Sequence, residues 1–272
     1  MNFKFFLMKK DNYFNNKNIL IGGSSNGIGW ASAKLFANSG ANVTLVSRNK
    51  TLLEQRLNQL ENNGFQNHHF IVLDFSNPEN LHTKFKEFVT KNSLEYDVVV
   101  NNTGGPPGGE LENASTQDLI NAMNLHLISF HKILDIILTG MKAKKSGRII
   151  NIISTSVKQP LNGLGVSNTV RGAVANWAKT LANELGKYNI TVNNVLPGAT
   201  NTRRLKEIII DKAKKLKIED SKVENQMANQ VPLKRIGEPI EVANAVYFLA
   251  SNKASYISGI NLPVDGGRTK SL

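Results

Sequence analysis

The chain has 272 residues, a formal net charge of +12 and no cysteine. The lack of cysteine excludes disulfides, thiolate catalysis and thiol-based metal sites, and we expect no metal. No apolar stretch reaches the length of a membrane span, and the short apolar run within residues 3–8 lacks the pattern of a secretory signal. We therefore expect a cytoplasmic protein without a membrane partner.

Lys and Arg outnumber Asp and Glu by 33 to 21. Such a balance can mark nucleic-acid binding, and it can also reflect an anionic cofactor and substrate. The basic residues are spread through several helical stretches, and no nucleic-acid-binding motif accompanies them. The pattern favours a lysine-rich solvated surface, so we expect no nucleic-acid partner.

Strand and helix patterns alternate along the chain. Apolar runs predict strands at residues 19–21, 43–46, 70–73, 96–100, 148–153, 191–196 and 261–264. Apolar residues at helical spacing predict helices at 28–40, 51–62, from 78 onward, at 115–141, at 166–185 and from 239 onward. The alternation predicts one α/β domain over residues 1–272, a doubly wound parallel sheet of about seven strands, after an N-terminal extension at 1–17.

Two connecting segments flank the predicted carboxyl edge of the sheet, where ligands of such sheets bind. The Gly- and Pro-rich stretch 104–109 follows the fourth strand, and we expect it to form a wall of the pocket. Residues 199–231 carry no strand pattern, and their first half is strongly basic. The basic residues of this half are Arg203, Arg204, Lys206, Lys212, Lys214, Lys215 and Lys217.

A glycine-rich turn joins the first strand to the first helix. Its glycines are spaced as Gly23-x-x-x-Gly27-x-Gly29, after Gly22. Glycines here let the backbone turn sharply and approach a diphosphate, and the following helix offers free N–H groups and the positive end of its dipole. Strand, glycine turn and helix in this order predict a dinucleotide site.

This spacing resembles the T-G-x-x-x-G-x-G signature of the short-chain dehydrogenase/reductase family, with Gly22 in place of its usual Thr. Further stretches agree in order over residues 17–267, at 101–104, 124–125, 147–154, 197–202, 235–243 and 258–267. The general pattern is similar to the 3-oxoacyl-(acyl carrier protein) reductase-like branch. The resemblance implies a Rossmann-like fold, an oxidoreductase acting on ketones and secondary alcohols, a homotetramer or homodimer, and a helical substrate lid at 199–231.

The resemblance also implies a catalytic set, and the chain departs from it. Ser154 matches the family Ser that polarises the carbonyl, and Asn124 matches the Asn that anchors a water chain. Ser167 and Arg171 stand where the family has its proton-donating Tyr and its Lys. A Ser hydroxyl is a far weaker acid than a phenol, and Arg keeps its proton. Water, a substrate group or His126 could then supply the proton, with His126 the least favoured.

The end of the second strand indicates the cofactor. Ser47 and Arg48 stand where an acidic residue would bind the ribose of NAD, and they suit a 2′-phosphate through charge-assisted hydrogen bonds. The sequence thus favours NADP(H) over NAD(H). The resemblance extends the expected cofactor contacts to a longer set. These residues are Gly23, Ser25, Asn26, Gly27, Ile28, Gly29, Asp74, Phe75, Asn101, Asn102, Thr103, Gly104, Arg171, Pro197, Gly198 and Thr202.

Two functions remain open at this point. The first is an atypical NADP(H)-dependent oxidoreductase that takes a small carbonyl or alcohol substrate. The second is a catalytically degenerate nucleotide-binding protein that acts as a sensor or as a non-catalytic subunit. The basic residues from Arg203 to Lys217 further suggest an anionic substrate, although they also fit a solvated helix face.

Overall fold

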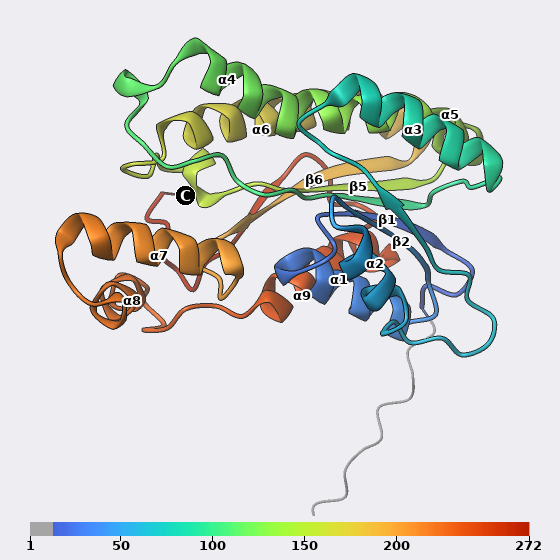
Figure 1. Ribbon diagram of the computed structural model, residues 1–272. Helices are drawn as coiled ribbons and strands as arrows, with labels where there is room; N and C mark the ends of the chain where they lie inside the picture. The colour runs from blue at the N-terminus through green and yellow to red at the C-terminus, as the bar shows by residue number, and fades with distance from the viewer. Residues whose placement is uncertain (1–12, 272) are drawn as a thin grey trace, which may run out of the picture.

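The computed structural model describes residues 13–271, so most of the expected N-terminal extension lies outside the described residues. Seven parallel strands form one sheet in the order β3-β2-β1-β4-β5-β6-β7 (Figure 1). Every strand boundary lies within two residues of its prediction. The strands are β1 (Asn18–Gly22), β2 (Asn42–Ser47), β3 (His69–Val72), β4 (Val98–Asn101), β5 (Gly147–Ile152), β6 (Ile190–Pro197) and β7 (Asn261–Val264).

Helices cover both faces of this sheet, as the doubly wound prediction requires (Figure 1). One face carries α3 (Pro78–Lys91), α4 (Thr116–Met123), α5 (Ser129–Lys144) and α6 (Gly165–Leu185). The other face carries α1 (Gly27–Asn38), α2 (Lys50–Leu57) and α9 (Pro239–Ala250). Each layer buries its own apolar cluster, around Phe85 and Phe130 on the first face and around Phe36 and Val246 on the second. None of the helices described in residues 13–271 is both long and apolar enough to traverse a bilayer.

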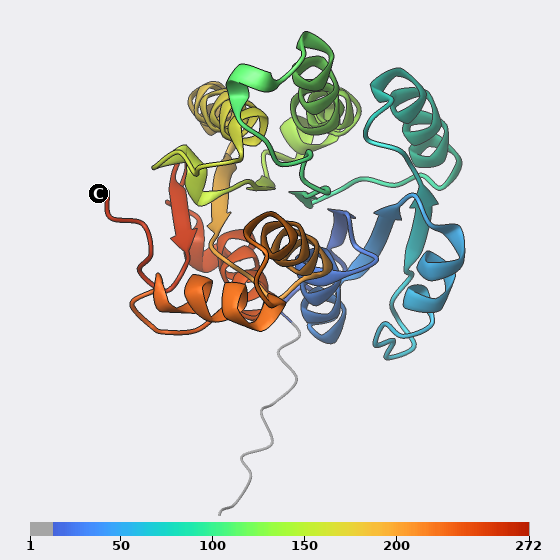
Figure 2. The same ribbon diagram turned by 60° about the vertical axis from the view of Figure 1, so that its left-hand side comes forward.

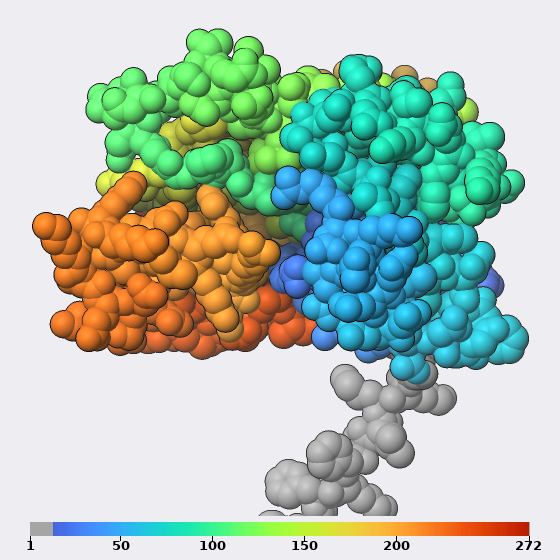
Figure 3. All heavy atoms as spheres, in the orientation of Figure 1, coloured from blue at the N-terminus to red at the C-terminus, as the bar shows by residue number. Residues whose placement is uncertain are grey.

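Residues 199–231 fold into two further helices, α7 (Arg203–Leu216) and α8 (Asp220–Asn229). They lie together on the side of the molecule where β6 ends (Figure 2). Leu205, Ile209 and Val223 form a small apolar cluster of their own between the two helices. The space-filling view shows the surface hollowed between these helices, in orange, and the N-terminal part of the chain, in blue (Figure 3).

Two helices differ from their predictions. The helix predicted at 51–62 ends at Leu57, and in the segment that follows, the side chain of Asn62 bonds to the backbone of Gly64 and Gln66. Leu60 nevertheless stays buried. The single helix predicted at 115–141 is divided by a π-helical segment, η2 (Asn124–Ile128).

A row of asparagines crosses four strands, from the last residue of β4 to the first residue of β7. Asn101, Asn151, Asn194 and Asn261 occupy paired register positions on β4, β5, β6 and β7. Each side-chain amide donates to the amide oxygen of the next, over 2.8 Å in all three bonds. The side chain of Asn101 is therefore a member of this amide ladder, below the site rather than in it.

Candidate functional site

The glycine turn is pressed against the chain that follows β4. A Cβ on Gly22 would lie 2.5 Å from the carbonyl oxygen of Asn102, so the turn has no space for the Thr of the family signature. The Asn102 side chain donates to the Gly22 carbonyl over 3.0 Å. Asn102, expected to contact the cofactor, therefore holds the turn in shape.

The N-terminus of α1 is open toward this turn. A Cβ on Gly29 would meet the Gly23 carbonyl oxygen at 2.4 Å, so the first helical turn packs directly on the glycine turn. Asn26 occupies the N-cap position, but its side chain makes no capping hydrogen bond, and the first turn of α1 contains no acidic residue. Free N–H groups and the helix dipole thus remain for a diphosphate. Ser25, Gly27 and Ile28 complete the turn and are half-buried.

The ends of β2 and β3 offer polar groups beside this turn. The Ser47 hydroxyl oxygen is buried and has no hydrogen-bond partner among the described residues, while Arg48 is exposed. An orphan hydroxyl beside a free guanidinium fits a ribose phosphate. Asp74 is exposed and accepts bonds from Ser76, whereas the ring of Phe75 is buried beneath Gly22 and packs edge-on against Phe130. Phe75 therefore supports the turn from below.

Arg56 is a residue that sequence reasoning missed. Its Nε donates to the carbonyl oxygen of Ser25 over 3.0 Å, and its guanidinium lies over the Trp30 ring at 4.7 Å. It thereby brings a second positive charge to the glycine turn from α2. The sequence gave no signal that this side of the helix predicted at 51–62 turns toward the glycine turn.

Ser154, Ser167, Arg171 and Asn124 lie on three segments that pack on one another, namely the end of β5 with η3 (Thr155–Val157), α6 and the π-helical segment. α6 contacts both η3, whose N-cap is Ser154, and the π-helical segment that begins at Asn124. The Ser154 oxygen accepts the Ser156 N–H over 3.1 Å, which leaves its own proton to donate. Ser167 is half-buried one helical turn before Arg171. The Asn124 carbonyl accepts the N–H of Ser129 five residues on, and such π segments are frequent at functional sites.

Arg171 is a buried cation. It is 6% exposed, its Nη1 donates to the Ile152 carbonyl over 2.8 Å, and its Nε has no partner among the described residues. Burial, and next the nearby charge of Arg204, lower the pKa of Arg171 to about 10. The guanidinium therefore remains charged at neutral pH and cannot serve as the acid.

His126 lies inside the fold, beside Arg171. It is fully buried, neither ring nitrogen has a partner among the described residues, and its ring packs edge-on against Phe130. Burial, and to a lesser extent the charge of Arg171, lower the pKa of His126 to about 2. His126 is thus a neutral imidazole at physiological pH, with no proton to give as an imidazolium.

The segments after β4 and β6 form the rim of the site across from the ends of β2 and β3. Thr103 and Gly104 follow β4. Pro197 ends β6, and Gly198 after it donates its N–H to the Val264 carbonyl. The Thr202 hydroxyl caps α7 by accepting the Leu205 N–H over 3.3 Å. A Cβ on Gly27 would lie 3.2 Å from the Thr202 methyl group, so the start of α7 lies directly over the glycine turn.

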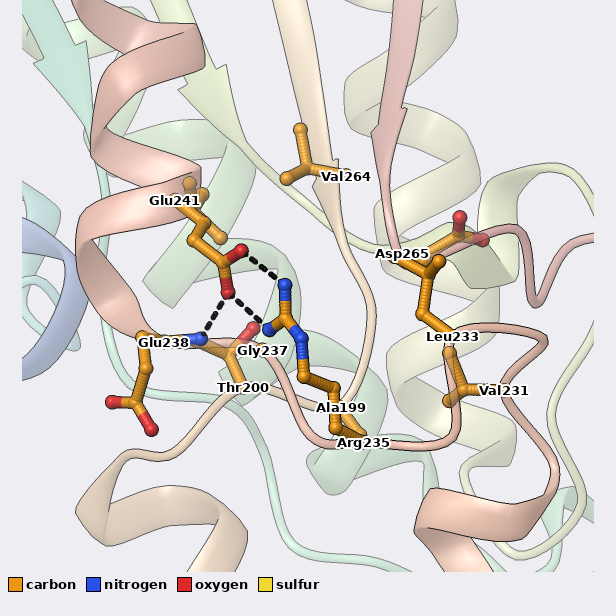
Figure 4. Close-up of a pocket in the computed structure, with 12 residues that line it drawn as sticks. Ala199, Thr200, Val231, Leu233, Arg235, Gly237, Glu238, Glu241, Val264 and Asp265 are labelled. Atoms are coloured by element: carbon orange, nitrogen blue, oxygen red, sulfur yellow. Dashed lines mark hydrogen bonds and ion pairs between the residues drawn. The ribbon is translucent and has the colours of Figure 1, made fainter.

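A second hollow lies behind this rim, between the ends of β6 and β7 and the start of α9 (Figure 4). Arg235 and Glu241 cross it with two hydrogen bonds of 2.7 and 2.6 Å, and Glu241 also accepts the Glu238 N–H. These bonds hold the pKa of Glu241 down to about 2. None of the residues expected to contact cofactor or substrate lines this hollow, so its ion pair serves to fix the chain that returns from α8 to α9.

The residues at the carboxyl edge fit a nicotinamide dinucleotide. The glycine turn and the open N-terminus of α1 suit a diphosphate, and the orphan Ser47 hydroxyl suits the adenosine ribose. The end of β5, which Ser154 follows closely, lies two strands along the sheet from the glycine turn that follows β1.

Comparison with known proteins agrees with this geometry. A family model described as enoyl-(acyl carrier protein) reductase matches residues 23–269. The chain is 31% identical to the 3-oxoacyl-[acyl-carrier-protein] reductase FabG of Chlamydia trachomatis, over 93% of this chain and 97% of the relative. It is 28% identical to the NADPH-dependent reductase BacG of Bacillus subtilis, over 92% of this chain and 96% of the relative.

Among solved structures, the L-sorbose reductase of Gluconobacter frateurii, complexed with NADPH and L-sorbose, superposes with a TM-score of 0.89. It is 30% identical, and the match covers 96% of this chain and all of that one. The family match, the relatives and the shared seven-stranded sheet together establish that the chain belongs to the short-chain dehydrogenase/reductase family.

Proposed function

We propose that the chain is an NADP(H)-dependent oxidoreductase that interconverts a ketone and a secondary alcohol. The observation that carries this proposal is the junction of α6 with the end of β5, where the buried Arg171 of α6 donates to the Ile152 carbonyl, two residues before Ser154. Ser167 lies one helical turn before Arg171 on the same helix. A hydroxyl donor and a fixed positive charge are the groups that an oxygen needs as it becomes an alkoxide. The reductase names of the relatives support the same class of reaction.

The preference for NADP(H) is supported by the groups around the expected ribose. Ser47 presents an orphan hydroxyl, Arg48 an exposed guanidinium, and Arg56 a second guanidinium at the glycine turn. Asp74, the acid at the end of the next strand, already accepts two bonds from Ser76. The names of BacG and of the sorbose reductase complex mention NADPH, which agrees with this preference.

The chain's own residues divide the work as follows. Bound NADPH would supply the hydride. Ser154 and Ser167 donate hydrogen bonds to the substrate oxygen, and Arg171 stabilises the negative charge that develops on it. Neither serine ionises near neutrality, Arg171 keeps its proton and His126 is neutral, so water delivers the final proton. α7 and α8 act as the lid over this site, which is supported by the contact of Thr202 with the glycine turn.

A panel of ketones with NADPH oxidation as the readout tests this function. We expect turnover by the wild type and a loss of about 100-fold in kcat for Ser154→Ala, because the donor to the developing oxyanion is removed. Ser156→Ala, two residues away, serves as the matched control. Equal rates for wild type and Ser154→Ala would contradict the assignment.

The second candidate function is nucleotide binding without turnover. It is favoured by one observation, the absence of the family's Tyr and Lys at Ser167 and Arg171. If it is correct, the wild type binds NADPH but oxidises none with any ketone, whereas a Ser167→Tyr/Arg171→Lys variant gains activity.

We further propose that the chain forms a homodimer or homotetramer. The stripe of Val170 and Val174 on α6 is fully buried within the protomer and is core packing. Ile120 and Ile128, by contrast, are 46% and 36% exposed on the outer side of the layer that contains α4 and α5. These side chains are available for contact with a second copy.

A further inference from the structure

The first turn of α7 lies over two neighbouring strand ends. Thr202, its N-cap, contacts the glycine turn that follows β1, since a Cβ on Gly27 would lie 3.2 Å from the Thr202 methyl group. Arg204, in the same turn, donates from its Nη2 to the Pro106 carbonyl oxygen over 2.6 Å, in the loop that follows β4. β1 and β4 are paired in the sheet. The first turn of α7 therefore covers the edge at which the glycine turn would hold a dinucleotide.

The acceptor of this hydrogen bond is held in place. Pro106 is buried and is followed by a second proline. The two rings fix φ at both residues, and Pro107 restricts Pro106 to an extended conformation, so the Pro106 carbonyl keeps one direction. Beyond the prolines, Gly109 donates to the Gly163 carbonyl over 2.7 Å and accepts from the Gly165 N–H over 2.9 Å. The loop is thus anchored to the start of α6.

The donor side of the hydrogen bond is held by fewer contacts. Within residues 13–271, α8 is the element against which α7 packs most extensively, through the apolar cluster that they share. The two ends of this helical segment meet, since the Gly237 N–H donates to the Ala199 carbonyl over 2.9 Å and the Asn201 N–H donates to the Gly237 carbonyl over 2.8 Å. Among the described residues, the bond of Arg204 is the one hydrogen bond that joins α7 to a residue outside 199–237. The position of α7 over the site therefore relies mainly on Arg204.

Arg204 also has a second partner on its own helix. Its side chain is 36% exposed, and the Glu207 carboxylate lies 3.9 Å from its Nη1, too far for a hydrogen bond but near enough for an ion pair. Glu207 moves with α7, so the guanidinium keeps this partner when it leaves the Pro106 carbonyl. Opening of α7 thus breaks one hydrogen bond without leaving the charge of Arg204 unpaired.

We propose that the bond from Arg204 to Pro106 latches α7 over the dinucleotide site, and that opening of this latch limits the release of the bound cofactor. The inference rests on the dinucleotide site of the proposed function, and it does not depend on whether a ketone is reduced. Arg204 acts here through the position of α7, so it is a positioning residue. A lid that must open before its ligand leaves sets the rate of release.

The dissociation rate of the cofactor tests the latch. The NADPH complex is mixed with excess NADP⁺, and the decay of NADPH fluorescence gives the rate. We expect about tenfold faster release from Arg204→Gln, because a hydrogen bond from a charged group is lost. The association rate should not fall, since the variant removes no contact with the cofactor. Lys206→Gln is the control, because it removes the same charge from an exposed position on α7 and should leave release unchanged.

A second variant breaks the latch from the loop. A Cβ on Gly105 would lie 3.4 Å from the Arg204 Nε, so the branched side chain in Gly105→Val would occupy the space of the guanidinium. This variant should release NADPH about as fast as Arg204→Gln. The double variant Arg204→Gln/Gly105→Val should be no faster than either single variant, because all three lose the same contact. Additive effects would show that the two residues act separately and would overturn the latch.

NADH separates the latch from a direct contact with the cofactor. A latch retains both dinucleotides, so Arg204→Gln should speed the release of NADH by the same factor as that of NADPH. Faster release of NADPH alone would assign Arg204 to the 2′-phosphate, and a fall in the association rate would assign its charge to attraction of the anion. Unchanged release rates in Arg204→Gln would also overturn the latch.

The outcome for the latch is separable from that for the proposed function. If Arg204→Gln speeds the release of both dinucleotides but no ketone is reduced, the latch stands and the reductase function fails. If ketones are reduced and release is unchanged, only the latch fails. If neither dinucleotide binds, both fail.

Discussion

Arg171 Nη1 donates a hydrogen bond of 2.8 Å to the carbonyl oxygen of Ile152, two residues before Ser154. This bond fixes the charge of α6 to the end of β5, close in sequence to the hydroxyl of Ser154. A lysine, with three donors on a flexible stem, would lack the second nitrogen that can hold the strand while another remains free to donate. Arg171 thus joins α6 to the strand, in addition to the role in catalysis that we propose for it.

Restoring the family pair should reveal how much this replacement costs in rate. In Ser167→Tyr/Arg171→Lys a phenol can donate the proton, and positioned proton donors contribute about 10²- to 10⁴-fold. We expect kcat for the best ketone to rise about 100-fold and to acquire a pH dependence. Steady-state NADPH oxidation over a pH series measures both. Ser167→Phe/Arg171→Lys is the control, since it adds the ring without the hydroxyl, and an equal gain there would contradict the role of the phenol.

Cofactor choice should depend on the charges around Ser47. Arg48→Asp should weaken NADPH binding by about 10- to 100-fold, as expected for loss of a charge-assisted bond to phosphate, and should spare NADH. Arg56→Gln should weaken NADPH as well, with a smaller effect on NADH. Fluorescence titration of each protein with both cofactors gives the dissociation constants. Equal affinity of the wild type for NADPH and NADH would contradict the prediction.

Burial of His126 should make the fold sensitive to acid. Its pKa is about 2 in the folded protein against 6.5 when exposed, so the unfolded chain binds the extra proton first. Above pH 6.5 the ring is neutral in both states and does not change the free energy of unfolding. Below pH 6.5 only the unfolded chain binds the proton, so the free energy of unfolding falls by about 1.4 kcal/mol per pH unit, or about 2 kcal/mol by pH 5.

Urea denaturation at pH 7, 6 and 5 measures this effect. His126→Leu should flatten the pH dependence relative to the wild type, and His131→Gln, on the exposed side of α5, should not. The pKa values of His68 and His69 are also lowered, chiefly by burial, but both residues remain in every variant and cancel in the comparison. An unchanged slope in His126→Leu would show that the ring is solvated.

Self-association should depend on the outer face of α4 and the π-helical segment. Sedimentation of the wild type at micromolar concentration should show a dimer or tetramer, and Ile120→Glu should shift it toward the monomer, because a charge would be buried at the contact. Phe65→Glu, at a 91% exposed position elsewhere, is the control. A wild-type monomer would refute the prediction.

The fold could be predicted from sequence because the spacing of apolar residues indicates strand or helix, and the positions of glycines indicate where the backbone turns sharply. Strands and most helix starts followed from short apolar runs, and the turn at Gly23 to Gly29 followed from the spacing of its glycines. The early end of α2 was missed, because apolar spacing does not record the polar bonds of the segment that follows it, such as those of the Asn62 side chain.

The site could be predicted only in part, for a different reason. Ser154 and Arg171 were found by their place in a motif. The hydrogen bonds of Arg56 to Ser25 and of Arg204 to Pro106 depend instead on which side of each helix faces the neighbouring loops. That orientation is set by packing between segments far apart in the chain. The sequence showed a basic stretch from Arg203 to Lys217. Only the structure shows that Arg204 bonds to the Pro106 carbonyl while Arg203 beside it is exposed.

The asparagine ladder links the register of each of its four strands to that of the neighbouring strand. Strand side chains alternate between faces, so a slip of one residue in β5 or β6 would move its asparagine to the opposite face and break two amide bonds. The last strand joins the sheet from a position about 160 residues after β4 in the chain, and a slip of β7 would leave the buried amide of Asn194 without its acceptor. The ladder thereby disfavours misaligned pairing of these strands while the sheet assembles.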